Sequence, residues 1–322
     1  MSHLKRLLGA TLVASSLSIA AAGAAECIAP ADPGGGWDFT CRTVGKLLYD
    51  LELVDEPMQV TNMPGGVGAV AYAYIASDRA DDASVITATS TVGITQIAQD
   101  KYPADTSVMR WLAMLGTDVG VILVPADSEY QTLEDLLAAL KEDPSSIAAA
   151  GSSGAGGWDH IRLLMLAEAA GLTPEQYKTI RWVQFDGGSP AVTQMMGGQV
   201  DIVSTDLGEI AGFVESGDIK ILAALSEEPI PAFPDAPTAA SLGYDVTGYN
   251  WRGFYIGGDV SDEEYDQWVG TLEDLYNTDE WKEAAEASGL ITVWRGGEEF
   301  ETYVNEQAEQ MRTISQEIGV IE

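Results

Sequence analysis

Basic residues are scarce in this sequence. Its 322 residues include 16 lysines and arginines but 50 aspartates and glutamates, which gives a formal net charge of −34 at pH 7. Proteins that bind nucleic acids gain much of their affinity from lysine and arginine clustered against the phosphate backbone. The charge balance therefore argues against a nucleic-acid partner.

Histidine and cysteine are almost absent, which restricts metal binding and catalysis. The chain has two histidines, His3 and His160, and two cysteines. No group of these residues has the spacing of a zinc site, and neither an EF-hand nor a P-loop pattern occurs. Residues 66–71 match the G-x-G-x-x-A form of a dinucleotide fingerprint, but the acidic residue that should follow is missing. We expect no metal and no cofactor.

A secreted hydrolase is the weaker alternative function. Residues 151–155 loosely match a nucleophile elbow, for which Ser153 would need a histidine base. His160 follows that serine by only seven residues, on the helix that the loop opens, whereas the hydrolase fold places its histidine late in the chain. We therefore expect a binding protein and not an enzyme.

Long hydrophobic runs are also missing, except at the start of the chain. Lys5 and Arg6 precede an apolar stretch over 7–22, and Ala22-Gly23-Ala24 has the small-x-small pattern of a signal peptidase site. Residues 1–24 therefore read as a signal peptide, cleaved near Ala24. No later segment approaches the roughly 18 apolar residues that span a bilayer, so we expect a periplasmic protein that is not embedded in the membrane.

The two cysteines, Cys27 and Cys41, both remain after this cleavage. An even number of cysteines in an exported protein favours a disulfide. A closed loop of about 15 residues would contribute ~3 kcal/mol to stability in the chain-entropy model. Two reduced, buried thiols are the alternative.

The acidic residues are dispersed along the chain and do not form a tail. Dispersed carboxylates with few lysines favour a protein adapted to high salt, where the Debye length falls to ~3 Å at 1 M and self-repulsion is screened. An ordinary acidic secreted protein is the alternative.

Strand-like and helix-like segments alternate, which predicts an α/β fold. Glycine-rich loops over 34–38, 65–68, 151–157 and 187–189 each precede a helical pattern. Free N–H groups and the dipole make a helix N-terminus an anion site, and glycine lets a ligand approach the backbone. Any single loop could be an ordinary turn, but the four loops together predict two lobes that face one cleft at the carboxyl ends of their strands.

At these loops the sequence resembles the periplasmic receptors of tripartite tricarboxylate transporters, the Bug or TctC-type family. The resemblance covers nearly the whole mature chain. It is carried by residues 29–38, 61–66, 110–113, 151–154 with Asp159-His160, 185–188, 197–201, 233–238 and 250–254.

The resemblance implies a two-lobed, type II periplasmic-binding-protein fold whose cleft closes on the ligand. One lobe would comprise residues 26–123 plus 222–322, and the other residues 124–221. The implied ligand is a small di- or tricarboxylate such as citrate, and the implied partners are the membrane permease subunits of the transporter. We expect a monomer. A sensor that docks on a signalling partner is an alternative that the sequence does not separate from a transport receptor.

By the same resemblance, backbone groups of the first loop would grip a ligand carboxylate, and the loop at 151–157 would face them. The candidate ligand-binding residues are Pro33, Gly34, Gly35, Gly36, Asp38, Asn62, Gly65, Gly66, Ser90, Thr91, Gly151, Ser152, Ser153, Gly154, His160, Gly187, Asp206 and Arg252.

Several of these residues have two interpretations. His160 contacts a second ligand carboxylate or makes a structural hydrogen bond to the backbone. Arg252 reaches the ligand or, as we favour, pairs with a carboxylate of the protein. Asp38 should cap its helix and orient water, because a bare carboxylate would repel an anion. Ser90 and Thr91 are hydroxyl donors or packing residues at a strand end, and Asp206 is a hinge or cleft residue.

Overall fold

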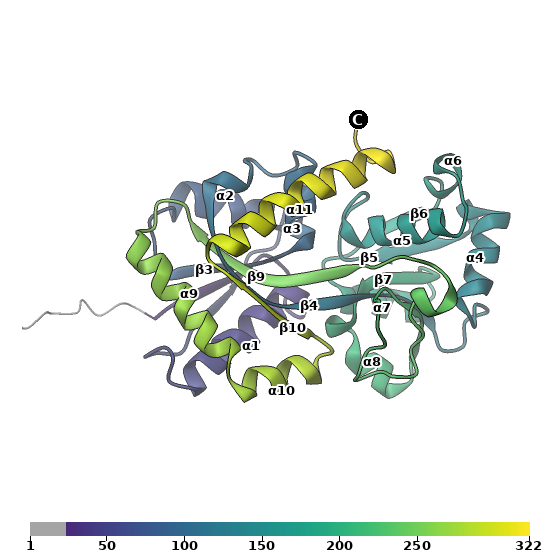
Figure 1. Ribbon diagram of the computed structural model, residues 1–322. Coiled ribbons are helices and arrows are strands. Elements are labelled where there is room, and N and C mark those ends of the chain that lie inside the picture. Colours follow the sequence, from purple (N-terminus) through teal and green to yellow (C-terminus); the bar gives the residue numbers. More distant parts are fainter. Residues whose placement is uncertain (1–23) are drawn as a thin grey trace, which may run out of the picture.

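Two lobes joined by a shared strand form the part of the chain that the structure describes, residues 24–322, in a computed structural model (Figure 1). The expected signal segment lies almost entirely outside these residues. The alternation of strands and helices confirms the predicted α/β class. No helix among the described residues is long and apolar enough to cross a membrane.

The first lobe is built on parallel strands that are followed by helices. Strand β1 pairs in parallel with β2 on one side and with β3 on the other. Every residue of β3 is buried, as expected of an inner strand covered on both faces. The elements in this part are β1 (Glu26–Ala29), α1 (Gly36–Asp50), β2 (Gln59–Asn62), η1 (Gly66–Gly68), α2 (Ala69–Asp78), β3 (Val85–Ser90), α3 (Thr91–Ala98) and η2 (Thr106–Val108).

The second lobe repeats this arrangement. Strand β5 pairs in parallel with β6 and with β7. Helix α4 begins with a capping box, in which the Thr132 hydroxyl accepts from the Asp135 N–H (3.1 Å) and the Asp135 carboxylate accepts from the Thr132 N–H (2.9 Å). The elements are α4 (Leu133–Glu142), η3 (Pro144–Ser146), β5 (Ala148–Gly151), α5 (Trp158–Ala169), α6 (Pro174–Tyr177), β6 (Arg181–Gln184), α7 (Gly188–Met196), β7 (Ile202–Asp206), η4 (Leu207–Glu209), α8 (Ala211–Ser216) and β8 (Ile219–Ala224).

A single long strand, β4 (Met109–Pro125), belongs to both lobes. Its residues 109–119 pair with β9 (Tyr249–Gly257), whereas residues 120–125 pair with β7 and β8 (Figure 1). The expected boundary at residue 222 would divide β8, which pairs with β4 along its length. We propose instead that the chain changes lobes near residues 119 and 249.

The C-terminal elements return to the first lobe. They are η5 (Ala240–Leu242) before β9, then α9 (Asp262–Tyr276), α10 (Asp279–Ala287), β10 (Ile291–Gly296) and α11 (Glu298–Glu317). Helix α11 runs over the first lobe toward the second (Figure 1). After it, Val320 lies so close to Gly156 that a Cβ there would be 2.2 Å from Val320 Cγ1. The end of the chain therefore contacts the second lobe.

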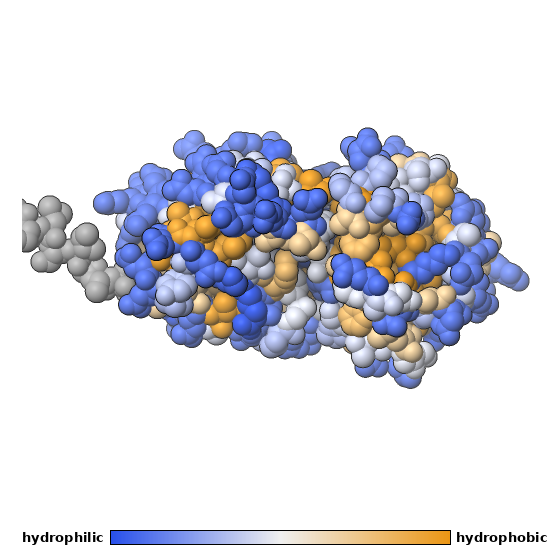
Figure 2. Space-filling view, turned by 90° about the horizontal axis from the view of Figure 1, so that it is seen from below, coloured by the Kyte–Doolittle hydropathy of each residue, from blue (hydrophilic) through white to orange (hydrophobic). Residues whose placement is uncertain are grey.

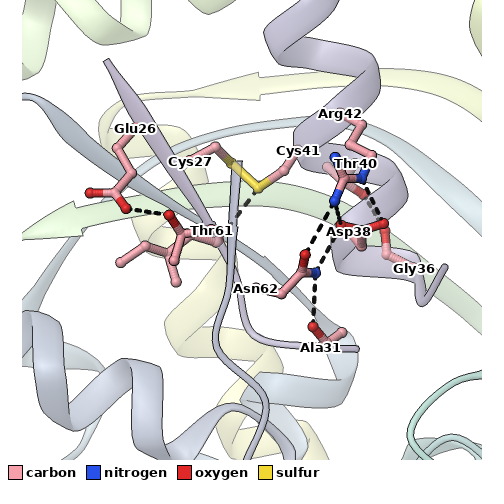
Figure 3. Close-up of a disulfide and its surroundings, with 11 residues drawn as sticks. Glu26, Cys27, Ala31, Gly36, Asp38, Thr40, Cys41, Arg42, Thr61 and Asn62 are labelled. Carbon is pink, nitrogen blue, oxygen red and sulfur yellow. Dashed lines mark hydrogen bonds and ion pairs between the residues drawn. A yellow bond between two sulfur atoms is a disulfide. The ribbon is translucent and has the colours of Figure 1, made fainter. Parts of the chain in front are cut away.

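The predicted disulfide between Cys27 and Cys41 is present (Figure 3). It joins β1 to the first turns of α1, with the two Cα atoms 5.7 Å apart and both residues fully buried. Because only the loop over 30–35 separates these two elements, the disulfide restrains the ends of that loop.

Hydrophilic residues cover much of the first lobe in the view of Figure 2, and larger apolar areas appear on the second lobe. Buried apolar residues extend through both lobes, including Leu112, Leu115, Ile122 and Val124 on the shared strand β4. The core is therefore continuous along the strand that joins the lobes.

Candidate functional site

A cavity of about 50 Å³ lies where the two lobes and strand β9 meet. The first lobe contributes mainly the loops after β1, β2 and β3, and the second lobe contributes the ends of β5, β6 and β7. The lining residues are Pro30, Ala31, Gly35, Gly36, Trp37, Pro64, Gly65, Val67, Ser90 and Val92 from the first lobe, Ser152, Gln184, Asp186, Gly187, Asp206 and Glu209 from the second, and Asn250 and Arg252 from β9.

The N-terminus of α1 opens on this cavity. Gly35 occupies the N-cap position in an extended conformation and supplies no side chain to cap the helix. The first hydrogen bond of the helix runs from the Phe39 N–H to the Gly35 carbonyl, so the N–H groups of residues 36–38 precede the intrahelical ladder. Uncapped donors at a helix N-terminus, together with its dipole, favour an anion.

Asp38 holds the first loop in place through hydrogen bonds. Its carboxylate accepts hydrogen bonds from the Arg42 side chain (2.9 Å) and from Asn62 Nδ2 (2.8 Å) (Figure 3). It also accepts a hydrogen bond from the Gly34 N–H (2.9 Å). Burial tends to raise the pKa of Asp38, but these hydrogen bonds outweigh it and lower the pKa. The carboxylate therefore orders the loop, and neither Asp38 nor Asn62 lines the cavity.

The loop after β6 faces the first loop across the cavity. Gly187 has φ +137°, and a Cβ on it would lie 3.4 Å from the Gly35 Cα. The two loops therefore approach each other at two glycines, Gly35 and Gly187. Gly187 also has a backbone conformation that residues with a side chain rarely adopt. The next N–H, of Gly188 at the start of α7, donates to the Glu209 carboxylate.

Arg252 is the basic residue among those that line the cavity. Its Nη2 lies 2.9 Å from Asp118, 2.9 Å from Asp206 and 3.7 Å from Glu209. It also packs against the first loop, since a Cβ on Gly36 would lie 2.5 Å from Nη1. The favoured interpretation of Arg252 as a partner of protein carboxylates matches these contacts, and the residue reaches the cavity as well.

Arg162 extends this buried network behind the cavity. It is fully buried and pairs with Asp206 (2.6 Å) and with Asp159. Two guanidinium groups thus face four carboxylates. Burial and the nearby Asp206 raise the pKa of Glu209 to about 8, although Arg252 acts in the opposite direction. Burial raises the pKa of Asp118 to about 6, again against Arg252. Burial would also raise the pKa of Asp206, but Arg162 and Arg252 lower it.

His160 does not lie where a ligand contact would require it. Its Nδ1 accepts a hydrogen bond from the Gly156 N–H (2.9 Å), and its ring packs on Trp182 with 4.7 Å between centroids. Burial, with a smaller effect of Lys101, lowers the pKa of His160 to about 4. The expected contact with a second ligand carboxylate is therefore replaced by the structural alternative, a backbone hydrogen bond of a neutral imidazole.

The loop over 151–157 contributes one residue, Ser152, to the cavity. The Ser153 hydroxyl instead receives the Asp159 N–H (3.2 Å) at the start of α5, and Trp182 Nε1 donates to the Ser153 carbonyl (2.8 Å). Contacts from the first lobe cover the loop, because Gln99 donates to the Gly156 carbonyl and Lys101 to that of Ala155. This loop closes the cleft more than it lines it.

The expected site residues divide into two groups. Those that line the cavity are Gly35, Gly36, Gly65, Ser90, Ser152, Gly187, Asp206 and Arg252. Those that lie outside it are Pro33, Gly34, Asp38, Asn62, Gly66, Thr91, Gly151, Ser153, Gly154 and His160.

Ser90 and Thr91 illustrate this division. Ser90 accepts from Trp37 Nε1 (3.1 Å) and caps α3, whereas Thr91 receives the Trp251 N–H (3.3 Å).

Sequence reasoning missed several lining residues, notably Glu209 and Asn250. Asn250 precedes Arg252 by two residues, and alternate residues of a strand share one face, so this signal was available. Glu209 stands on a short helix after β7 without a pattern that marks it. No group of His, Cys, Asp and Glu in the described residues could hold a metal ion.

The fold and the interlobe cavity are those of a two-lobed solute-binding protein. The sequence profile of the family described as "Tripartite tricarboxylate transporter family receptor" matches residues 51–320. The chain belongs to this family, whose members are periplasmic substrate-binding receptors and not enzymes, and the resemblance read from the sequence is confirmed.

Named relatives agree with this assignment. BugT of Bordetella pertussis is 27 % identical over 229 residues, which make up 68 % of this chain and 65 % of that protein, so the match spans just under two thirds of that relative. MatC of Rhodopseudomonas palustris, solved with bound malate, superposes with a TM-score of 0.78 at 17 % identity over 90 % of this chain and 98 % of that one. R. palustris Rpa4515 with adipate has a TM-score of 0.82 at 17 % identity, over 92 % and 97 %. These two likenesses show the fold.

Proposed function

We propose that this protein is a periplasmic receptor that binds one small C4–C6 carboxylate between its lobes and delivers it to the permease of a tripartite tricarboxylate transporter. The observation that carries the proposal is the uncapped N-terminus of α1, which opens with Arg252 on the interlobe cavity. Hydrogen bonds to a charged group contribute ~1.5–3 kcal/mol each, so three or four can offset the cost of immobilising a small ligand.

The charge of the cavity determines which candidate ligands should bind more tightly. Asp186 and Asp206 line it together with one basic residue, Arg252, so each further negative charge on the ligand meets repulsion. A dicarboxylate is therefore favoured over a fully ionised tricarboxylate such as citrate. The malate and adipate bound by two proteins of similar fold support the same class.

Ligand binding can be tested with a panel of carboxylic acids on the exported protein. Thermal shift in 1–2 M salt comes first, and calorimetry follows. We expect one site per chain with micromolar or tighter affinity for a C4–C6 diacid. If every carboxylate leaves the melting temperature unchanged and gives no heat, the proposal is wrong.

A matched pair of glycine variants places the site. A Cβ on Gly36 would lie 2.5 Å from Arg252 Nη1 and 2.6 Å from Glu209 Oε1, whereas Gly270 in α9 has no atom within 4 Å of such a Cβ. Gly36→Ala should weaken binding at least about tenfold, which is 1.4 kcal/mol, and Gly270→Ala should leave it unchanged. Equal affinity of both variants would place the ligand elsewhere.

An uptake experiment distinguishes a transport receptor, which delivers its ligand to a permease, from a sensor. We expect deletion of the gene to abolish uptake of the bound acid and restoration of the gene to recover it. Normal uptake, together with lost transcriptional response to the acid, would favour the sensor. The protein is proposed to act as a monomer. Size-exclusion chromatography with light scattering, which measures the molar mass in solution, checks this.

A further inference from the structure

Glu209, on the wall of the cavity, makes a long contact with Arg252. The Glu209 side chain is 5 % exposed, and its Oε1 lies 3.7 Å from Arg252 Nη2, which is too far for a hydrogen bond. The same Nη2 lies 2.9 Å from Asp118 and 2.9 Å from Asp206. Arg252 therefore compensates mainly these two carboxylates, and Glu209 is buried with little positive charge beside it.

The other charged groups around Glu209 do not correct this imbalance. Arg162, the second guanidinium of the network, pairs with Asp159 and Asp206. A buried carboxyl group without a cation of its own is more stable in its neutral form. The charged groups around Glu209 are Arg252 from β9, Asp206 from β7, Asp118 from β4, Arg162 and Asp159 from α5, Asp186 after β6, and Asp38 with its partner Arg42 from α1.

The pKa of Glu209 agrees with this geometry. Burial, together with Asp206 and Asp159, raises the pKa to about 8, although Arg252 acts in the opposite direction. At pH 7 most molecules therefore have a neutral carboxyl group at this position. A neutral carboxyl group can donate a hydrogen bond, whereas an ionised one can only accept.

The two oxygens of Glu209 face different partners. Oε2 accepts a hydrogen bond from the Gly188 N–H at the start of α7. Oε1 faces the first loop, since a Cβ on Gly36 would lie 2.6 Å from it. Because a protonated carboxyl group has one O–H donor and the Gly188 N–H already engages Oε2, the proton belongs on Oε1. The donor is thus directed toward the N-terminus of α1.

We propose that Glu209 binds the ligand in its neutral form, as a hydrogen-bond donor to the carboxylate at the N-terminus of α1. Ligand binding then requires a proton, because an ionised Glu209 has no hydrogen to donate and repels the anion. This inference rests on the proposed function and adds to the same cavity a binding residue and a dependence on pH.

The pH dependence of the affinity tests the inference on the wild-type protein. The probe is the tightest binder at pH 7 among succinate, glutarate and adipate, whose carboxyl groups stay ionised above that pH. With a pKa of about 8 for Glu209, the affinity should fall about thirtyfold between pH 7 and pH 9.5, mostly above pH 8. An affinity that does not change over this range refutes the inference and leaves the proposed function standing. If none of the three acids binds, both fail.

Proton uptake gives a second test that needs no variant. Calorimetry at pH 8.5 in Tris and in triethanolamine, two buffers with different ionisation enthalpies, reports the protons exchanged when the same diacid binds. Most Glu209 is ionised at that pH, whereas the bound form is neutral. Binding should therefore take up roughly half to one proton per chain. Proton release, or no exchange, contradicts binding in the neutral form.

The variant Glu209→Gln imitates the neutral acid at every pH. Its amide keeps an oxygen for the Gly188 N–H and directs an N–H donor toward the first loop. Its affinity should vary less than about threefold between pH 7 and pH 9.5, so that at pH 9.5 it binds at least tenfold more tightly than the wild type. Glu215→Gln makes the same change on exposed α8, outside the cavity, and should keep the wild-type profile. A fall of about thirtyfold in folded Glu209→Gln protein places the titrating group elsewhere and overturns the inference.

The variant Glu209→Ala tests the donor itself. It removes the carboxyl group and therefore its charge, as Glu209→Gln does, but it supplies no hydrogen-bond donor. At pH 7 it should bind the diacid at least tenfold more weakly than Glu209→Gln. Equal affinities of these two variants would show that the neutral group only avoids repulsion, which refutes the donor role.

Discussion

Replacing Arg162 with leucine removes one of the two cations from the buried network behind the cavity. Arg162 is fully buried, and it donates to Asp206 (2.6 Å), to Asp159 and to the Gly248 carbonyl (3.1 Å). Its loss leaves Arg252 alone with Asp118, Asp159, Asp206 and Glu209. Breaking a buried pair by deleting one partner typically costs ~3–5 kcal/mol, because an uncompensated charge stays buried. We expect the free energy of unfolding at pH 7 to fall by that amount.

The loss should depend on pH in a defined direction. In the wild type the pKa of Asp206 is lowered by Arg162 and Arg252. A carboxylate with a lowered folded-state pKa contributes stability above its unfolded value of ~3.9, and this contribution is lost as the pH falls. In the Arg162→Leu variant burial is opposed by one guanidinium fewer, so the pKa values of Asp206 and Asp159 should rise above that unfolded value, and both carboxylates should take up protons as the pH falls from 7 to 5. The difference in free energy of unfolding between the wild type and the variant should therefore be smaller at pH 5 than at pH 7.

Urea unfolding at both pH values measures these differences, and an exposed ion pair supplies the control. Arg312 pairs with Asp100 at 2.7 Å, but the two side chains are 44 % and 77 % exposed. Arg312→Leu should cost less than ~1 kcal/mol. A loss below ~1 kcal/mol for Arg162→Leu, or a difference that is the same at pH 5 and pH 7, would refute the reasoning.

Four further outcomes are expected. Cys27→Ala/Cys41→Ala should lower the free energy of unfolding by ~3 kcal/mol in urea, and an unchanged midpoint would contradict that role of the disulfide. The His160 imidazole should stay neutral to about pH 4 in an NMR titration, and its contribution to stability should be lost as the pH falls from 6.5 to 4. His160→Ala should leave ligand affinity within about twofold, since the ring lies outside the cavity. Raising salt from 0.1 M to 2 M should raise the melting temperature by screening surface carboxylates, and a flat response would favour an ordinary acidic protein.

Local features of this protein could be read from the sequence. The even cysteine count in an exported chain predicted the disulfide that joins β1 to α1. The glycine loops could be placed before helices because a helix start is decided by its own few residues, as at Gly35, where no side chain competes for the free N–H groups. The two-lobed α/β class followed from the alternation of these units and from the family resemblance.

The composition of the cavity was decided only by the tertiary structure. Asp206 ends β7 and Glu209 lies on η4 just after it, whereas Asn250 and Arg252 come from β9, more than 40 residues later in the chain. Their ion pairs and hydrogen bonds depend on the register of β9 against β4, which no local pattern reveals. The choice between the two interpretations of His160 also depended on the tertiary structure. A side chain in the first turn of a helix beside the loop could point into the cavity or away from it. The hydrogen bond from the Gly156 N–H and the packing on Trp182 hold the imidazole outside the cavity.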